Sequence, residues 1–73
     1  MSDFQDKYDD AKELFHKMSD DDLIEAGQEL ITELEHSDFI ASVCDQHADG
    51  HEMTEDQRQA FINACAYIEA KYR

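Results

Sequence analysis

Residues 19–34 read SDDDLIEAGQELITEL, and this stretch decides the fold. Ser19 can accept a hydrogen bond from an unpaired backbone amide, and the three aspartates after it suit the positive N-terminus of a helix. The apolar residues have the i, i+3, i+4, i+7 spacing of an amphipathic helix: Leu23, Ile24, Gly27, Leu30, Ile31 and Leu34. The stretch therefore predicts one helix with one apolar face.

A similar start occurs at three other places in the chain. Ser2, Ser37 and Thr54 are each followed by an acid, and together with Ser19 they lie 17, 18 and 17 residues apart. Gln57, three residues after Thr54, completes a capping box. The sequence lacks the alternation of apolar and polar residues that is typical of strands. We therefore predict an all-α fold, a small four-helix bundle with short connections in which the third helix is short.

The remaining apolar residues fit these helix starts. The stripes of the first and third helices comprise Phe4, Tyr8, Ala11, Leu14, Phe15 and Met18, and Phe39, Ile40, Val43, Cys44 and His47. Gly50 is placed to end the third helix. The fourth helix, roughly Glu55 to Tyr72, is apolar around much of its circumference, which predicts burial by several neighbouring helices or by a second copy in a homodimer. Gly27 costs about 1 kcal/mol relative to Ala inside a helix, and we interpret it as a point of close approach between two helices.

Length and composition limit the class of protein. The 73 residues form one domain, residues 1–73, because no second core could be built from so short a chain. Hydrophobic residues reach 41% and recur periodically, so we expect a folded domain and not a disordered acidic tail. The two cysteines are too few for a disulfide-stapled secreted protein, and the acidic start lacks the blocks of a signal peptide. These features predict a cytoplasmic protein, of the producing cell or of a host.

The formal net charge of −13 is concentrated in the middle of the chain. Between Met18 and Gln57 there are thirteen carboxylates and no Lys or Arg, whereas the six acids outside this stretch are matched by six basic residues. Self-repulsion of this kind destabilises a compact state, but it gives a strong negative field that steers a cationic partner. We therefore expect the charge to serve binding, against the alternative of an ordinary solvated surface.

Four of these acids lie along one side of the predicted 19–34 helix. Asp21, Glu25, Glu29 and Glu33 are four residues apart, which places neighbours about 6 Å apart along the helix axis. Each like-charge pair at this spacing costs roughly 0.2–0.5 kcal/mol, and no Lys or Arg on the helix relieves it. The predicted partner-binding residues are these four and three neighbours: Asp21, Asp22, Glu25, Glu29, Glu33, Glu35 and Asp38.

A helical rod of carboxylates resembles the charge display of a nucleic acid, since double-stranded DNA carries one negative charge per ~1.7 Å of axis. In charge, size and helicity the chain is similar to the DNA-mimic proteins, many of them small phage products that disarm restriction, CRISPR or nucleoid proteins. The resemblance implies an inhibitor of the anti-defence, anti-restriction or anti-CRISPR type, which occupies the Lys/Arg-rich surface of a nucleic-acid-binding protein as a DNA or RNA mimic. Direct contact with nucleic acid or membrane is not expected, because phosphates and anionic headgroups repel an acidic surface. An exposed Tyr67 or Tyr72 would anchor the contact.

The alternative prediction is a small metal-binding regulatory module. Residues 45–56 resemble a degenerate EF-hand calcium loop, in which loop positions 1, 5, 6 and 12 are Asp45, Asp49, Gly50 and Asp56. The segment departs from the family at position 3, where His47 replaces an oxygen ligand, and at position 8, where Glu52 replaces an apolar residue.

The same region offers a possible zinc site, whose candidate ligands are Cys44, His47, His51 and Cys65. Both cysteines fall on apolar helix faces, where a free thiol behaves as a small buried hydrophobe, so we interpret them as core residues. No metal or other cofactor is therefore expected. The sequence also has no nucleophile elbow, phosphate loop or nucleotide fingerprint, and we do not predict an enzyme.

Overall fold

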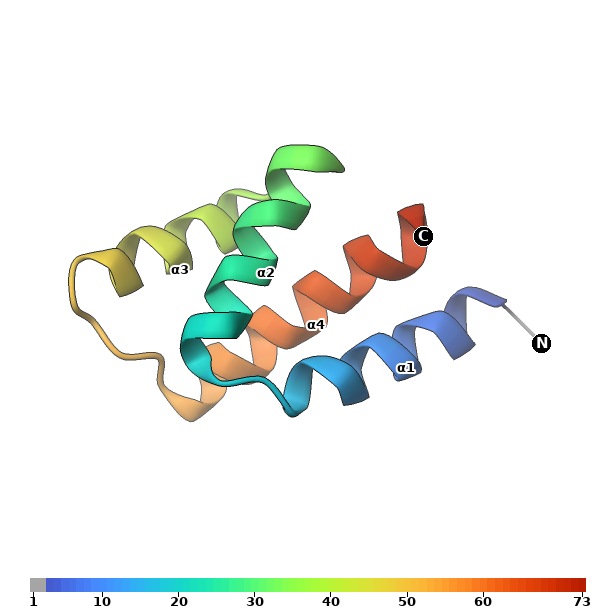
Figure 1. Ribbon diagram of the computed structural model, residues 1–73, viewed down its shortest axis with the longest axis horizontal. Coiled ribbons are helices and arrows are strands. Elements are labelled where there is room, and N and C mark those ends of the chain that lie inside the picture. The colour runs from blue at the N-terminus through green and yellow to red at the C-terminus, as the bar shows by residue number, and fades with distance from the viewer. Residues whose placement is uncertain (1–2) are drawn as a thin grey trace.

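The computed structural model describes residues 3–73, which form four helices joined by short connections (Figure 1). The helices are α1 (Asp3–His16), α2 (Asp20–Glu33), α3 (Asp38–Ala48) and α4 (Glu55–Tyr72). The predicted all-α class is confirmed, and so is the short third helix, which has 11 residues against 14, 14 and 18 in the others. In the part of the chain described here, every helix falls short of the length or the apolar character that crossing a membrane requires.

Three of the four predicted helix caps are confirmed. The Ser19 and Ser37 hydroxyls each accept a hydrogen bond from the backbone amide three residues later, both at 3.3 Å. Thr54 accepts from the amide of Gln57 at 3.1 Å, and its own amide donates to the Gln57 side chain at 3.2 Å, which completes the predicted capping box. The fourth predicted cap, Ser2, lies outside the described residues.

The end of α3 confirms the role predicted for Gly50. This glycine has a φ of 96°, in the left-handed region that residues with a Cβ rarely adopt. The Gly50 amide donates to the carbonyl of His47, and the His51 amide donates to that of Gln46, both at 3.0 Å. This pair of bonds is the Schellman arrangement, which satisfies carbonyls that the end of a helix leaves free. The chain then turns toward the start of α4.

The other three helices all contact α4, which is the centre of the fold. α1 lies antiparallel along one side of α4, while α2 and α3 pack against each other and against α4 on the other side (Figure 1). The residues of α4 that these neighbours bury are Phe61, Ile62, Cys65, Ala66, Ile68 and Ala70. Neighbours within one chain thus explain why α4 is apolar around so much of its circumference.

Gly27 is the point of close approach that the sequence predicted. It lies in the middle of α2 and is buried. A Cβ built at this position would lie 2.4 Å from Cζ of Phe61 on α4 and 3.2 Å from Cγ2 of Ile40 on α3. Phe61 and Ile40 are themselves fully buried, with 0% exposure. The missing side chain therefore allows α2 to pack closely on two neighbours at once.

Candidate functional site

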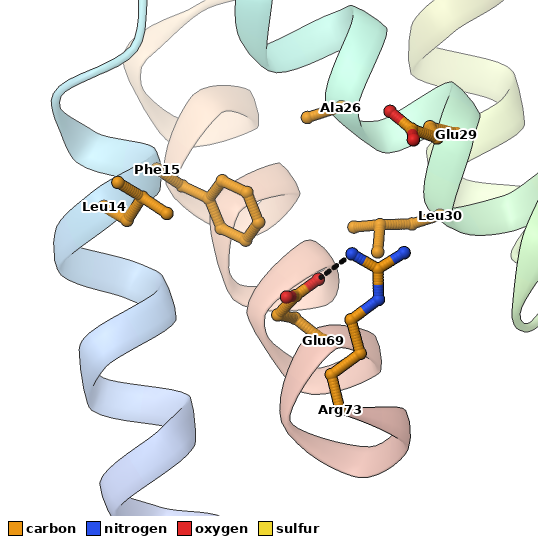
Figure 2. Close-up of a pocket in the computed structure, with 7 residues that line it drawn as sticks. All are labelled: Leu14, Phe15, Ala26, Glu29, Leu30, Glu69 and Arg73. Atoms are coloured by element: carbon orange, nitrogen blue, oxygen red, sulfur yellow. Dashed lines mark ion pairs between the residues drawn. The ribbon is translucent and has the colours of Figure 1, made fainter.

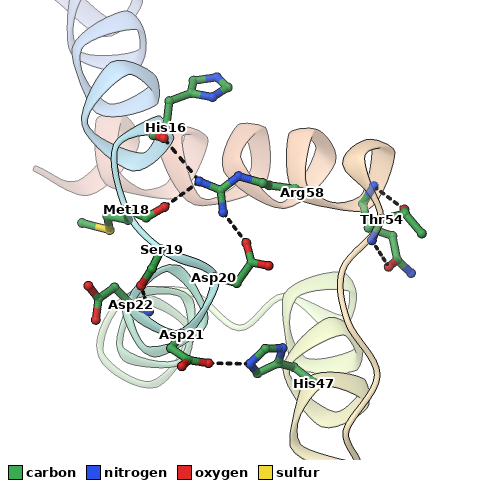
Figure 3. A network of polar contacts seen from close by, with 10 residues as sticks. His16, Met18, Ser19, Asp20, Asp21, Asp22, His47, Thr54 and Arg58 are labelled. Carbon is green, nitrogen blue, oxygen red and sulfur yellow. Dashed lines mark hydrogen bonds and ion pairs between the residues drawn. The ribbon is translucent and has the colours of Figure 1, made fainter.

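The basic residues of the chain decide which acids remain unpaired. Arg58 on α4 forms an ion pair with Asp20 at the start of α2, and its side chain is only 19% exposed (Figure 3). Its second terminal nitrogen donates to the backbone oxygens of Met18 at 2.6 Å and His16 at 3.3 Å. The cation thus also meets the negative C-terminal end of α1. Arg58 fixes the α1–α2 connection onto α4.

The end of α4 supplies the next two partners. Nζ of Lys71 lies 3.0 Å from Oε1 of Glu35, and the Tyr72 hydroxyl donates to the same oxygen at 2.8 Å. These two hydrogen bonds lower the pKa of Glu35, and the Glu35 carboxylate in turn raises the pKa of Lys71 and of Tyr72. Glu35 therefore ties the α2–α3 connection to the end of α4.

Two more of the predicted binding residues are paired. The Arg73 guanidinium lies 3.5 Å from the carboxylate of Glu33 on α2 and 3.8 Å from that of Glu69 on α4. Asp38 accepts from its neighbour His36 at 2.9 Å. The sequence interpretation, which treated the two ends of the chain as neutral by themselves, missed that the cations at the C-terminus reach acids in the middle. Of these contacts, only the i, i+4 spacing of Glu69 and Arg73 was visible in the sequence.

Asp21 is also engaged, by a histidine from the neighbouring helix. Nε2 of His47 on α3 lies 2.9 Å from the Asp21 carboxylate at the start of α2 (Figure 3). The other ring nitrogen, Nδ1, is buried without a hydrogen-bond partner. Because the carboxylate of Asp21 can only accept, the ring donates to it through Nε2–H. His47 thus joins α2 to α3.

Three of the seven predicted binding residues have no ion pair within residues 3–73, namely Asp22, Glu25 and Glu29. All three are exposed on α2, at i, i+3 and i+7 positions that form one strip along the helix. We call this strip the α2 acidic face. The exposed Gln28 and Thr32 lie beside it, so uncharged residues occupy the positions from which a Lys could relieve Glu25 and Glu29.

A second group of acids without an ion pair in the described chain lies where α3 ends and α4 begins. Its members are exposed and comprise Asp45, Asp49, Glu52, Glu55 and Asp56. The predicted EF-hand segment is not one continuous loop here, because Asp45 lies within α3 and Asp56 within the first turn of α4. Across residues 3–73, no three His, Cys, Asp or Glu side chains gather as a metal site.

The four candidate zinc ligands have different surroundings. Cys44 and Cys65 are buried core thiols, as interpreted from the sequence. Burial raises the pKa of the Cys65 thiol to about 12 and also raises that of Cys44, whose sulfur lies 3.7 Å from the carbonyl of Ile24. His47 binds Asp21, and His51 is exposed beyond the glycine that ends α3. The thiols are therefore held in their neutral form.

An apolar groove borders the α2 acidic face, and no pattern in the sequence indicates it. It is a hollow of about 180 Å³ between α1, α2 and the last turns of α4 (Figure 2). The lining residues are Leu14, Phe15, Ala26, Glu29, Leu30, Glu69 and Arg73. Leu14 is 57% exposed, although its neighbour Phe15 is buried in the core. Glu29 belongs to both the groove and the acidic face, so the two surfaces are continuous.

In comparisons with known proteins, no family model, no curated protein and no solved structure matches the chain. The site offers a row of exposed carboxylates beside an apolar hollow, an arrangement suited to binding a surface that is both basic and apolar.

Proposed function

We propose that this protein is an acidic interaction protein that binds the basic surface of a nucleic-acid-binding protein and excludes the nucleic acid from it. The observation that carries the proposal is the α2 acidic face, on which Asp22, Glu25 and Glu29 stay exposed without an ion pair in the described chain. Such a face raises the local negative potential and steers a cationic partner into contact.

The use of the cations elsewhere supports this proposal. Arg58 and Lys71 lie on α4 and Arg73 directly follows it, and each pairs with an acid of α2 or of the connection after α2. The acids of these pairs hold the helices together, whereas those of the α2 acidic face hold no part of the fold. Carboxylates that cost stability through repulsion and have no ion pair within residues 3–73 are best explained by a contact with another molecule.

The spacing of the carboxylates supports a nucleic-acid-like display. Glu25 and Glu29 stand about 6 Å apart along the axis of α2, and Asp22 extends the row to about 10 Å. Three carboxylates over about 10 Å are spaced by about 5 Å on average, against about 3.4 Å of axis per phosphate along one DNA strand, so the row resembles the charge of a single strand more than that of a duplex. A nucleic acid competitor of this kind should itself leave DNA and RNA unbound, because like charges repel.

The test is capture of a partner followed by competition. Immobilised protein should retain a basic protein from a host lysate, and labelled DNA or RNA bound to that protein should be displaced by the wild-type chain. The Glu25→Lys/Glu29→Lys variant should stay helical, since Lys and Glu have similar helix propensities, and should bind the captured protein more weakly through slower association. Wild-type affinity should fall as salt is added.

A matched control separates the α2 acidic face from net charge. Asp6→Lys/Asp9→Lys changes the formal charge by the same amount, and it alters exposed acids of α1. This control should bind nearly as well as the wild type. If both variants lost affinity for the captured protein equally, the effect would come from overall charge and not from the α2 acidic face. A captured protein that binds nucleic acid and this chain at the same time would contradict the competition that we propose.

A further inference from the structure

We propose that the groove beside the α2 acidic face receives a large aliphatic side chain from a cationic amphipathic helix of the partner. This inference rests on the proposed function, and it adds the chemistry by which the partner is recognised. In this mode of recognition an amphipathic helix lays its apolar face into a hydrophobic groove, with anchors at i, i+3 or i+4 spacing. Here the basic residues of the incoming helix would pair with Glu25 and Glu29.

The groove exists because α1 and α2 share few contacts. Both helices pack on α4, and they diverge from the connection between them, which Arg58 holds (Figures 1 and 3). Ala26, Glu29 and Leu30 of α2 face this opening at i, i+3 and i+4 positions, and Leu14 faces it from α1 (Figure 2). Because Ala26 has a small side chain, it leaves room in the groove next to Leu30.

The groove is long enough for more than one side chain. A second hollow continues it along α1 and is lined by Lys7, Asp10, Ala11, Leu14, Glu69 and Arg73. From Leu14 back to Lys7, α1 covers about 10 Å along its axis, or two helical turns. A partner helix could therefore place two successive apolar anchors along α1.

Charge complementarity identifies the occupant as cationic. Glu29 and Glu69 stand at the edges of the first hollow, and Arg73, the cation in its lining, is already paired with Glu33 and Glu69. Beyond Glu29 the surface continues into Glu25. A partner with Lys or Arg on either side of its apolar anchor would meet carboxylates on the α2 side. A second copy of this chain, with a formal charge of −13, would meet repulsion there.

The test uses two synthetic helical peptides of equal charge as probes, one of Leu and Lys with an apolar face and one of Ala and Lys. Isothermal titration calorimetry should show that the wild-type protein binds the Leu/Lys peptide at least about tenfold more tightly, because the groove buries a leucine side chain. Leu14→Ser should remove most of this preference. Phe39→Ser, which alters an apolar residue of α3 with 43% exposure, is the matched control and should keep it.

Two further variants keep the result decisive. Ala26→Gln, which places a bulky polar side chain in the groove, should also remove the preference, and it replaces Leu14→Ser if circular dichroism shows that variant unfolded. Glu25→Gln should weaken binding of both peptides to a similar degree.

Equal affinity of the wild type for the two peptides would overturn the inference, and so would a preference that survives both groove variants. In either case, a loss of affinity in Glu25→Gln would leave the proposed function standing. If instead Glu25→Gln bound both peptides unchanged while the groove variants lost their preference, the groove would still take an apolar anchor, but the steering role of the α2 acidic face and the cationic character of the occupant would both be refuted. Analytical ultracentrifugation that found a wild-type dimer dissociated by Leu14→Ser would assign the groove to a second copy and overturn the inference.

Discussion

Gly27 gives the sharpest test of the packing, because two opposing effects of one methyl group can be compared. Replacing Gly by Ala inside a helix normally stabilises it by about 1 kcal/mol. Here the new Cβ would lie 2.4 Å from Cζ of Phe61 and 3.2 Å from Cγ2 of Ile40. Carbon atoms pack best at about 3.5–4.0 Å, so the first contact is shorter than this by more than an ångström.

The steric effect should be the larger of the two. Phe61 has 0% exposure, so its ring cannot move away from the new methyl group without disturbing other core residues. Overpacking of a filled core costs about 1–3 kcal/mol, and a contact this short with a rigid, buried ring belongs at the upper end of that range. After subtraction of the helix-propensity gain, Gly27→Ala should lower the free energy of unfolding by about 1–2 kcal/mol. In a domain of this size each kcal/mol lowers the melting temperature by roughly 4–8 °C.

The measurement is urea unfolding followed by circular dichroism. Gln28→Ala, at an exposed neighbouring position, is the control for helix propensity and should leave stability nearly unchanged. In a Phe61→Leu background the side chain has no ring to clash with, so Gly27→Ala should be much less harmful there than in the wild type. The steric reasoning would be refuted if Gly27→Ala raised the melting temperature, or if its penalty were the same in both backgrounds.

Four further predictions concern the polar contacts, the thiols, metal and charge. Arg58→Met should lower the free energy of unfolding by about 1.5–3 kcal/mol in urea titrations, because hydrogen bonds from a charged group are lost; an unchanged midpoint would contradict the role given to Arg58. Burial raises the pKa of Cys65 from 9.0 to about 12, so the unfolded chain loses this proton first and stability should fall as the pH rises from 9 toward 12. A melting temperature that stays constant over that range would refute it. A chelator should leave the melting temperature unchanged, and stoichiometric zinc in the purified protein would show this expectation to be wrong. Added salt should raise the melting temperature by screening the self-repulsion, and equal melts at low and physiological salt would mean that the charges repel less than the sequence suggests.

The helices could be predicted from the sequence because their signals are local. A cap such as Ser19 or Thr54 acts on an amide three residues away, so the pattern that marks a helix start lies within one turn. The same holds for Gly50, whose backbone conformation ends α3. Even the close approach at Gly27 could be inferred, since a costly glycine inside a helix needs a reason. Its partner, Phe61, could not be named, because that contact spans helices far apart in the sequence.

The candidate site was less predictable than the helices, because it depends on contacts between residues far apart in the sequence. Counting charges along the chain assigned Lys71 and Arg73 to their own end, but folding brings them to Glu35 and Glu33. Likewise, the spacing of acids along α2 could not reveal that Asp21 meets His47 on α3. The groove depends on the divergence of two helices, which no periodicity encodes. Sequence reasoning thus located the charged surface, and the tertiary contacts decided which of its acids stay unpaired.

The uncharged residues beside the α2 acidic face support the proposal that this face binds a partner. Gln28 and Thr32 are exposed and lie between or next to Glu25 and Glu29, where a Lys would form favourable pairs worth roughly 0.2–0.5 kcal/mol each. Thr is also a poorer helix former than Lys, so stability alone would favour the cation at position 32. The chain does place cations opposite acids where these join helices, as Arg58 does with Asp20. The α2 helix pairs Asp20 with Arg58 and Glu33 with Arg73 but leaves this stabilisation unused along its acidic face. It is therefore better suited to presenting its carboxylates to a partner than to maximal stability.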